Sequence, residues 1–170
     1  MNPQIAILMG SDSDRPVMDE TGKILEQFGV VYDMKVLSAH RSPKLVTEYA
    51  AEAQERGIKV FICGAGGAAH LAGIVAAHTI LPVIGVPLES ALKGVDSFVS
   101  TLQMPAGVPV ATVAIGKAGA KNAAYLALEI LALGDRKLIE KLYQHKREME
   151  QVVKSKNKKI TMVSKNRRIR

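Results

Sequence analysis

The stretch Ile58-Lys-Val-Phe-Ile-Cys-Gly-Ala-Gly-Gly-Ala-Ala-His70 joins an apolar run, a glycine-rich loop and the start of an alanine-rich segment. A short apolar run rich in β-branched and aromatic residues predicts a buried strand over residues 58–63. The alanine-rich segment from His70 to His78 predicts a helix. A strand, a loop and a helix in this order form the repeating unit of an α/β fold with a parallel sheet.

The same order recurs on both sides of this stretch. Further strands are expected at residues 4–9, 30–37, 82–86 and 110–115. Further helices are expected at residues 14–28, from Pro43 onward, and at 94–103 and 118–133. Nearly continuous apolar strands separated by helix-length spacers indicate a parallel sheet that helices cover on both faces. We therefore predict a flavodoxin-like three-layer α/β/α sandwich whose five strands lie in the order 2-1-3-4-5.

The charge of the chain is concentrated at its C-terminal end. Of the 23 Lys and Arg residues, eight lie in residues 154–170, which leaves 15 against 16 acidic residues elsewhere. We expect one catalytic domain over residues 1–153, ending in a protruding amphipathic oligomerisation helix at 135–153, and a poorly ordered basic tail at 154–170. A nucleic-acid contact by this tail is the weaker alternative, because no aromatic side chain interleaves its charges.

Other features exclude several classes of protein. Cys63 lies within an apolar run, which is typical of a core residue rather than a nucleophile. No apolar run is long enough to cross a bilayer, and the N-terminus shows no secretory signal pattern, so we expect a cytoplasmic protein without membrane contact. The four histidines lack clustered carboxylates, and we therefore expect no metal site.

Three loops that follow predicted strands hold most of the polar side chains suited to chemistry. They are Gly10-Ser-Asp-Ser-Asp14, Ser38-Ala-His-Arg41 and Gly64-Ala-Gly-Gly-Ala-Ala-His70. In the predicted strand order they follow three adjacent strands, at the carboxyl edge where α/β sheets bind ligands. We therefore expect the three loops to form one site.

Each loop has a chemical interpretation. The serines and backbone amides of the first loop suit a phosphate, and Asp14 suits a sugar hydroxyl, although the same residues also suit a helix cap. His40 is a candidate proton carrier, and Arg41 can bind phosphate or carboxylate through two hydrogen bonds. The glycine loop permits close backbone approach and offers amides to an anion, while His70 suits either a ligand contact or a helix cap.

Together with Gln103-Met-Pro-Ala-Gly-Val-Pro-Val-Ala-Thr112, these loops resemble the class I N5-carboxyaminoimidazole ribonucleotide mutases of purine biosynthesis. The resemblance extends from the first strand to the helix ending near Leu133. It implies conversion of N5-carboxyaminoimidazole ribonucleotide to 4-carboxy-5-aminoimidazole ribonucleotide without a cofactor. It also implies a homo-octamer, and it leaves room for a transient contact with the preceding ATP-dependent synthetase.

The resemblance further implies a role for each site residue. It makes His40 the general acid and base of the reaction. It implies that nine residues bind the imidazole ribonucleotide substrate: Ser11, Ser13, Asp14, Ser38, Arg41, Gly66, Ala68, His70 and Leu71. The chain departs from the family pattern at Ala72, where relatives usually have proline, and at Arg15, where an apolar residue is frequent.

Two other functions are compatible with the same motifs. One is direct carboxylation of aminoimidazole ribonucleotide with CO2, the reaction of class II enzymes of this family. The other is a non-catalytic nucleotide-binding module, because a fold by itself does not define an activity. An assay with each aminoimidazole ribonucleotide, with and without bicarbonate, distinguishes these functions from the mutase.

Overall fold

The computed structural model describes residues 2–167, with side chains up to Lys158 and at Ile160. It contains a parallel sheet with the strand order β2-β1-β3-β4-β5. The strands are β1 (Ile5–Met9), β2 (Tyr32–Val36), β3 (Val60–Gly66), β4 (Val83–Leu88) and β5 (Ala111–Thr112). The predicted flavodoxin-like order is therefore confirmed.

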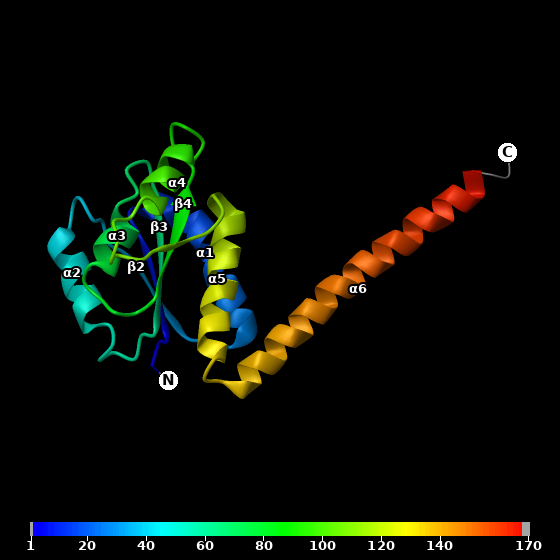
Figure 1. Cartoon of the computed structure of the whole chain (residues 1–170), viewed down its shortest axis with the longest axis horizontal. Helices are drawn as coiled ribbons and strands as arrows, with labels where there is room; N and C mark the ends of the chain where they lie inside the picture. Colours follow the sequence, from blue (N-terminus) through cyan, green and yellow to red (C-terminus); the bar gives the residue numbers. More distant parts are fainter. Residues whose placement is uncertain (1, 168–170) are drawn as a thin grey trace. The chain divides into compact units, whose positions relative to one another are not determined.

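Helices cover the sheet on both faces (Figure 1). On one face lie α1 (Arg15–Phe28) and α5 (Gly116–Ala132), and on the other lie α2 (Pro43–Glu52) and α3 (Leu71–Ala76). A short 3-10 helix, η1 (Asp12–Asp14), precedes α1, and α4 (Val95–Leu102) contacts β4. This arrangement is the predicted three-layer sandwich.

Local sequence signals explain where the helices begin and end. Helices α1 and α2 each have a proline in their first turn, where the missing N–H costs no hydrogen bond. Helix α1 ends at Gly29, whose φ of 73° is the left-handed conformation common after a helix. The buried side chains of α1 include Met18, Leu25 and Phe28, which share the face turned toward the sheet.

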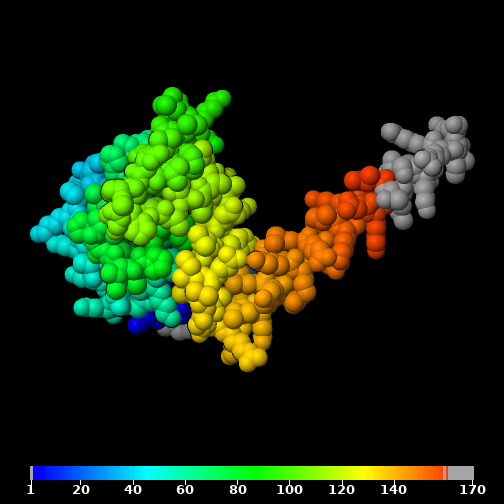
Figure 2. All heavy atoms as spheres, viewed as in Figure 1, coloured from blue at the N-terminus to red at the C-terminus, as the bar shows by residue number. Residues whose placement is uncertain are grey.

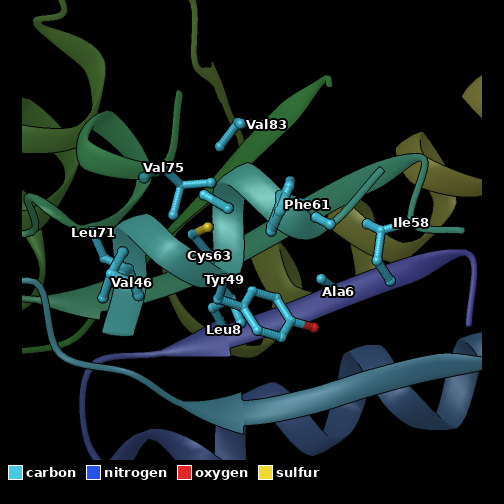
Figure 3. Packing of buried hydrophobic residues seen from close by; sticks show 13 residues of the cluster. Ala6, Leu8, Val46, Tyr49, Ile58, Phe61, Cys63, Leu71, Val75 and Val83 are labelled. Carbon is cyan, nitrogen blue, oxygen red and sulfur yellow. The ribbon is translucent and has the colours of Figure 1, made fainter. Parts of the chain in front are cut away.

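A hydrophobic cluster fills the space between the sheet and helices α2 and α3 (Figure 3). Phe61 and Cys63 of β3 point into this cluster, where Val46 and Tyr49 of α2 meet them. Full burial of a side chain such as Phe61 contributes about 1.5–3 kcal/mol to stability. Cys63 is buried, and burial raises the pKa of its thiol, so it is the core residue that the sequence predicted.

Strand β3 is longer than predicted. It continues past Cys63 to Gly66, because Gly64 and Gly66 pair with Val86 and Leu88 of β4. A Cβ at Gly64 would lie 2.4 Å from the sulfur of Met18, so glycine allows α1 to pack closely on the sheet. Strand β5 is shorter than predicted and keeps two residues at the sheet edge. The glycine-rich segment therefore begins as strand and becomes a loop only after Gly66.

A second compact unit begins at Ala132. Its helix α6 runs from Arg136 to Arg167, so the backbone stays helical beyond Val153. Lysine and glutamate four residues apart, such as Glu150 and Lys154, favour this continuation. The division into a domain and a tail at residue 153 stays a prediction.

Helix α6, whose described atoms run from yellow-orange to red in Figure 2, has a polar composition with scattered exposed apolar side chains. These exposed side chains are Ile139, Tyr143, Met149, Val152 and Val153. Within residues 2–167, no helix combines the length and the apolar character that a membrane crossing requires.

Candidate active site

The three predicted loops meet at one pocket beyond the carboxyl ends of β1, β2 and β3, with a volume of about 400 Å³. All ten residues predicted for the site line it: Ser11, Ser13, Asp14, Ser38, His40, Arg41, Gly66, Ala68, His70 and Leu71. The structure thus brings together residues from three separate parts of the chain, while their individual roles stay predictions.

The first loop combines a helix cap with the pocket wall. The backbone N–H of Ser11 donates to Oδ2 of Asp14 over 3.0 Å, and the two residues form a capping box around η1. Ser13 donates from its hydroxyl to that of Ser11 over 3.0 Å. Burial raises the pKa of Asp14. Part of this rise is offset by backbone N–H groups that donate to its carboxylate and by the positive charge of Arg41 nearby. The cap and the ligand-binding interpretation therefore apply to the same side chains.

The second loop presents a positive charge that is held in place by backbone and hydroxyl oxygens. Arg41 donates from Nη2 to the carbonyl of Gly10 over 2.7 Å and from Nε to Oγ of Ser38 over 3.4 Å. A guanidinium has five N–H donors, so these two contacts leave others for an anion in the pocket. The contact with Gly10 also ties the loop after β2 to the loop after β1.

The two pocket histidines contact each other. Nε2 of His40 lies 2.8 Å from Nδ1 of His70, and their ring centroids are 4.9 Å apart at an interplanar angle of 82°. One of these nitrogens donates and the other accepts, and the tautomers of the two rings decide which. His70 precedes α3 and makes no side-chain hydrogen bond to its amides, so its ring belongs to the pocket and not to a helix cap.

The third loop uses most of its amides internally. The N–H of Gly67 donates to the hydroxyl of Ser97 over 2.8 Å. The N–H groups of Ala69 and His70 donate to the carbonyls of Gly67 and Ala68 over 2.9 and 2.8 Å. The expectation that these amides bind an anion is therefore wrong for these three groups, because Ser97 occupies the first and the turn itself occupies the other two.

The pocket wall also includes three small residues that the sequence analysis did not name as site residues. Gly10, Ala39 and Ala65 lie within or beside the three motifs. Their small side chains could have marked them as site residues in the sequence, since small residues let a ligand approach the backbone. Among the described side chains, no cluster of three or more His, Cys, Asp or Glu could hold a metal ion.

A family model described as AIR carboxylase matches residues 4–152, which is most of the chain. This chain belongs to the AIR carboxylase family. The match confirms the resemblance seen in the motifs, and it includes every residue of the pocket.

Relatives within the AIR carboxylase family are named N5-carboxyaminoimidazole ribonucleotide mutase. The Pyrococcus horikoshii protein is 55% identical over 159 residues, covering 93% of this chain and 89% of the relative. The Bacillus subtilis protein is 54% identical over 154 residues, covering 90% of this chain and 95% of that relative. The sequence thus places this chain beside proteins that carry the mutase name.

Solved structures agree with this placement. The crystal structure of Treponema denticola PurE2-S38D has a TM-score of 0.85 at 29% identity, over 94% of this chain and 98% of that one. The crystal structure of Treponema denticola PurE has a TM-score of 0.83 at 29% identity, over 92% of this chain and 98% of that one. Their overlap extends over nearly the whole of both chains.

Proposed function

We propose that this protein converts N5-carboxyaminoimidazole ribonucleotide to 4-carboxy-5-aminoimidazole ribonucleotide in purine biosynthesis. Relatives that share more than half of their aligned residues with it are named for this mutase activity. The observation that carries the proposal is the meeting of all ten predicted residues at one pocket. A volume of about 400 Å³ lies within the range of small-molecule sites.

The reaction moves a carboxyl group from the exocyclic nitrogen to C4 of the same imidazole. When the N–C bond breaks and CO2 leaves, the nitrogen takes up a proton. When CO2 adds to C4, the proton on that carbon has to be removed. His40 can perform both transfers in turn, and a positioned acid and base contributes about 10²–10⁴-fold to the rate. His70, 2.8 Å away, is placed to share the proton between the two steps.

The charged and hydroxyl groups of the first two loops account for nucleotide binding. Arg41 suits the phosphate, since guanidinium and phosphate form charge-assisted hydrogen bonds. Ser11 and Ser13 supply hydroxyls beside it, and Asp14 accepts a hydrogen bond from a ribose hydroxyl. The small residues Gly66 and Ala68 leave room for the imidazole near the histidine pair.

A substrate comparison tests this proposal. The purified protein is incubated with N5-carboxyaminoimidazole ribonucleotide without bicarbonate, and with aminoimidazole ribonucleotide with and without bicarbonate. The proposal expects rapid conversion of the first substrate and little carboxylation of the second. Faster carboxylation of the second substrate would identify a direct carboxylase. Calorimetric binding of both nucleotides without turnover would identify a non-catalytic binding module.

The proposal extends to the assembly, for which we expect a homo-octamer. The exposed apolar side chains of α4, Val95, Val99 and Leu102, support it, as do those of α6. Apolar surface of this kind on separate helices is typical of contacts between subunits. Light scattering of the purified protein tests the assembly, and a stable monomer would overturn it.

We also propose a cytoplasmic location and a transient contact with the ATP-dependent synthetase that makes the substrate. The chemistry supports the contact, because an N-carboxylated amine loses CO2 readily in water and gains from a short path to the next enzyme. Cell fractionation tests the location. Cross-linking of the two purified enzymes tests the contact, and a lack of cross-links at concentrations that support coupled turnover would argue against it.

A further inference from the structure

Ser97 lies outside the pocket lining but is connected to it. It belongs to α4, and its side chain is fully buried. Its hydroxyl accepts the N–H of Gly67 over 2.8 Å and donates to the carbonyl of Leu88 over 2.7 Å. One hydroxyl therefore joins a helix, the end of β4 and the turn that follows β3.

Gly67, the residue that Ser97 holds, adds no side-chain packing to the turn, although Ala69 two residues later is buried. Gly67 has a φ of 65°, and a Cβ built on it would meet no non-neighbouring atom of the described chain within 4 Å. Since no side chain restrains Gly67 itself, hydrogen bonds set the position of its peptide. The hydrogen bond from the N–H of Gly67 to Ser97 joins the middle of the turn to a different element of the fold, α4.

The position of this turn matters because His70 follows it directly. The N–H of Ala69 donates to the carbonyl of Gly67, so a shift of Gly67 is passed along the turn. The ring of His70 then meets His40 over 2.8 Å, a contact that tolerates only a few tenths of an ångström of displacement. The alignment of the histidine pair thus depends on the peptide that Ser97 holds.

The proton and one acceptor lone pair of the Ser97 hydroxyl are engaged, which argues against a role as a nucleophile. Its proton goes to the carbonyl of Leu88, and one lone pair accepts from Gly67. The neighbouring Ser90 donates to the carboxylate of Asp96, and its oxygen lies 3.5 Å from that of Ser97. We therefore expect Ser97 to influence the reaction through the geometry of the loop.

We propose that Ser97 is a positioning residue of the active site, which aligns His70 with His40 by anchoring the turn at Gly67. This role rests on the proposed mutase function, in which the histidine pair transfers the proton. The groups proposed to bind the phosphate and the ribose lie in the loops after β1 and β2, which Ser97 does not contact. The proposal therefore expects the loss of the Ser97 hydroxyl to slow the chemical step more than it weakens substrate binding.

The test compares Ser97→Ala with Thr101→Val. Thr101 lies one turn further along α4, is also buried, and donates its hydroxyl to the carbonyl of Ser97 over 2.7 Å. Each variant loses a buried hydroxyl from the same helix, but only Ser97 contacts the glycine turn. Thermal unfolding of both proteins measures how much of any effect is a general loss of stability.

Ser97→Ala should lower kcat by at least about tenfold with KM near the wild-type value, since small misplacements of reacting groups have effects of this size or larger. Thr101→Val should leave kcat near the wild-type value, although its melting temperature should fall by about as much as that of Ser97→Ala. Wild-type kcat in Ser97→Ala, or equal losses of kcat in both variants, would overturn the proposal.

Hydrogen exchange separates this proposal from the mutase function itself. Peptides covering residues 64–70 should take up deuterium faster in Ser97→Ala than in Thr101→Val, whatever the enzyme does. Unchanged exchange in this segment would overturn the anchoring role even if kcat fell. An inactive wild-type protein with faster exchange in Ser97→Ala would contradict the mutase function and the catalytic alignment while retaining the anchor.

Discussion

At the scale of single residues, the groups proposed for proton transfer and for charge recognition are different side chains of the pocket. His40 and His70 contact each other, while Arg41 is held by Gly10 and Ser38. Substitutions at these two places should therefore affect turnover and binding differently.

His40→Asn should abolish most of the catalysis and leave binding largely intact. Asparagine keeps some hydrogen bonding but cannot take up a proton at neutral pH, so turnover in both directions should fall by at least about 10². Arg41→Ala should instead weaken nucleotide binding more than it slows the bound substrate. Turnover and calorimetric binding of both variants check this, and near-normal turnover in His40→Asn would make His70 the better proton carrier.

Asp14 should reduce stability at neutral pH. Burial raises its pKa above 3.8, so the folded protein binds this proton more tightly than the unfolded chain does. The stability of the folded state therefore declines as pH rises through the interval between 3.8 and the raised pKa. Asp14→Asn keeps an acceptor for the N–H of Ser11 and removes the buried charge.

Asp14→Asn should accordingly raise the melting temperature at pH 7 and weaken nucleotide binding. At pH 3 both side chains are neutral, and the two proteins should melt at nearly the same temperature. Thermal melts of both proteins at the two pH values check this. A melting-temperature difference that is the same at pH 7 and pH 3 would contradict the explanation.

At the scale of the elements, Ala72 stands where the resemblance to the family led us to expect proline. It is the second residue of α3, and the first hydrogen bond across the helix start is donated by Ile74 to His70. A proline at position 72 therefore removes no helical hydrogen bond. Ala72→Pro should stabilise the protein by about 0.4–1 kcal/mol, because proline lowers the conformational entropy of the unfolded chain. Calorimetry measures this, and a lower melting temperature would mean that the ring does not fit beside the sheet.

Gly119 allows the start of α5 to pack against the segment that precedes it. A Cβ there would lie 1.6 Å from the carbonyl oxygen of Ala114, which is backbone and cannot turn aside. Gly119→Ala should cost at least about 3 kcal/mol, the upper end of overpacking costs. Gly134→Ala is the matched control, since a Cβ there meets no described atom within 4 Å and should change stability by less than about 0.5 kcal/mol. Chemical denaturation compares the two variants, and similar midpoints would contradict the steric argument.

At the scale of the whole molecule, the pocket residues and the basic end belong to different units. All residues that line the pocket lie between Gly10 and Leu71, within the unit of residues 1–131. Truncation after Val153 should therefore leave turnover nearly intact. Assays and light scattering of the truncated protein check this. A large loss of turnover would show that residues 154–170 reach an active site or hold the assembly together.

Much of the fold followed from local patterns in the sequence. The strands of residues 4–9 and 82–86 were predicted to within two residues, because the apolar runs are bounded by polar or helix-breaking residues. The end of β3 was placed three residues too early. Glycine lowers strand propensity, yet Gly64 and Gly66 pair with β4 because tertiary packing overrides that preference.

The sequence by itself determined the parallel sheet and the position of the site, because hydrophobic period and the residues that follow each strand are local properties. Only the tertiary structure decided which groups meet there. His40 meets His70, and Gly67 meets Ser97, each across 30 positions of the chain. A hydrogen bond needs its two atoms placed to within a few tenths of an ångström, and the packing of helices on the sheet sets that placement. No local pattern predicted a role for Ser97, since serine is common in amphipathic helices and its partner Gly67 lies far away in the sequence.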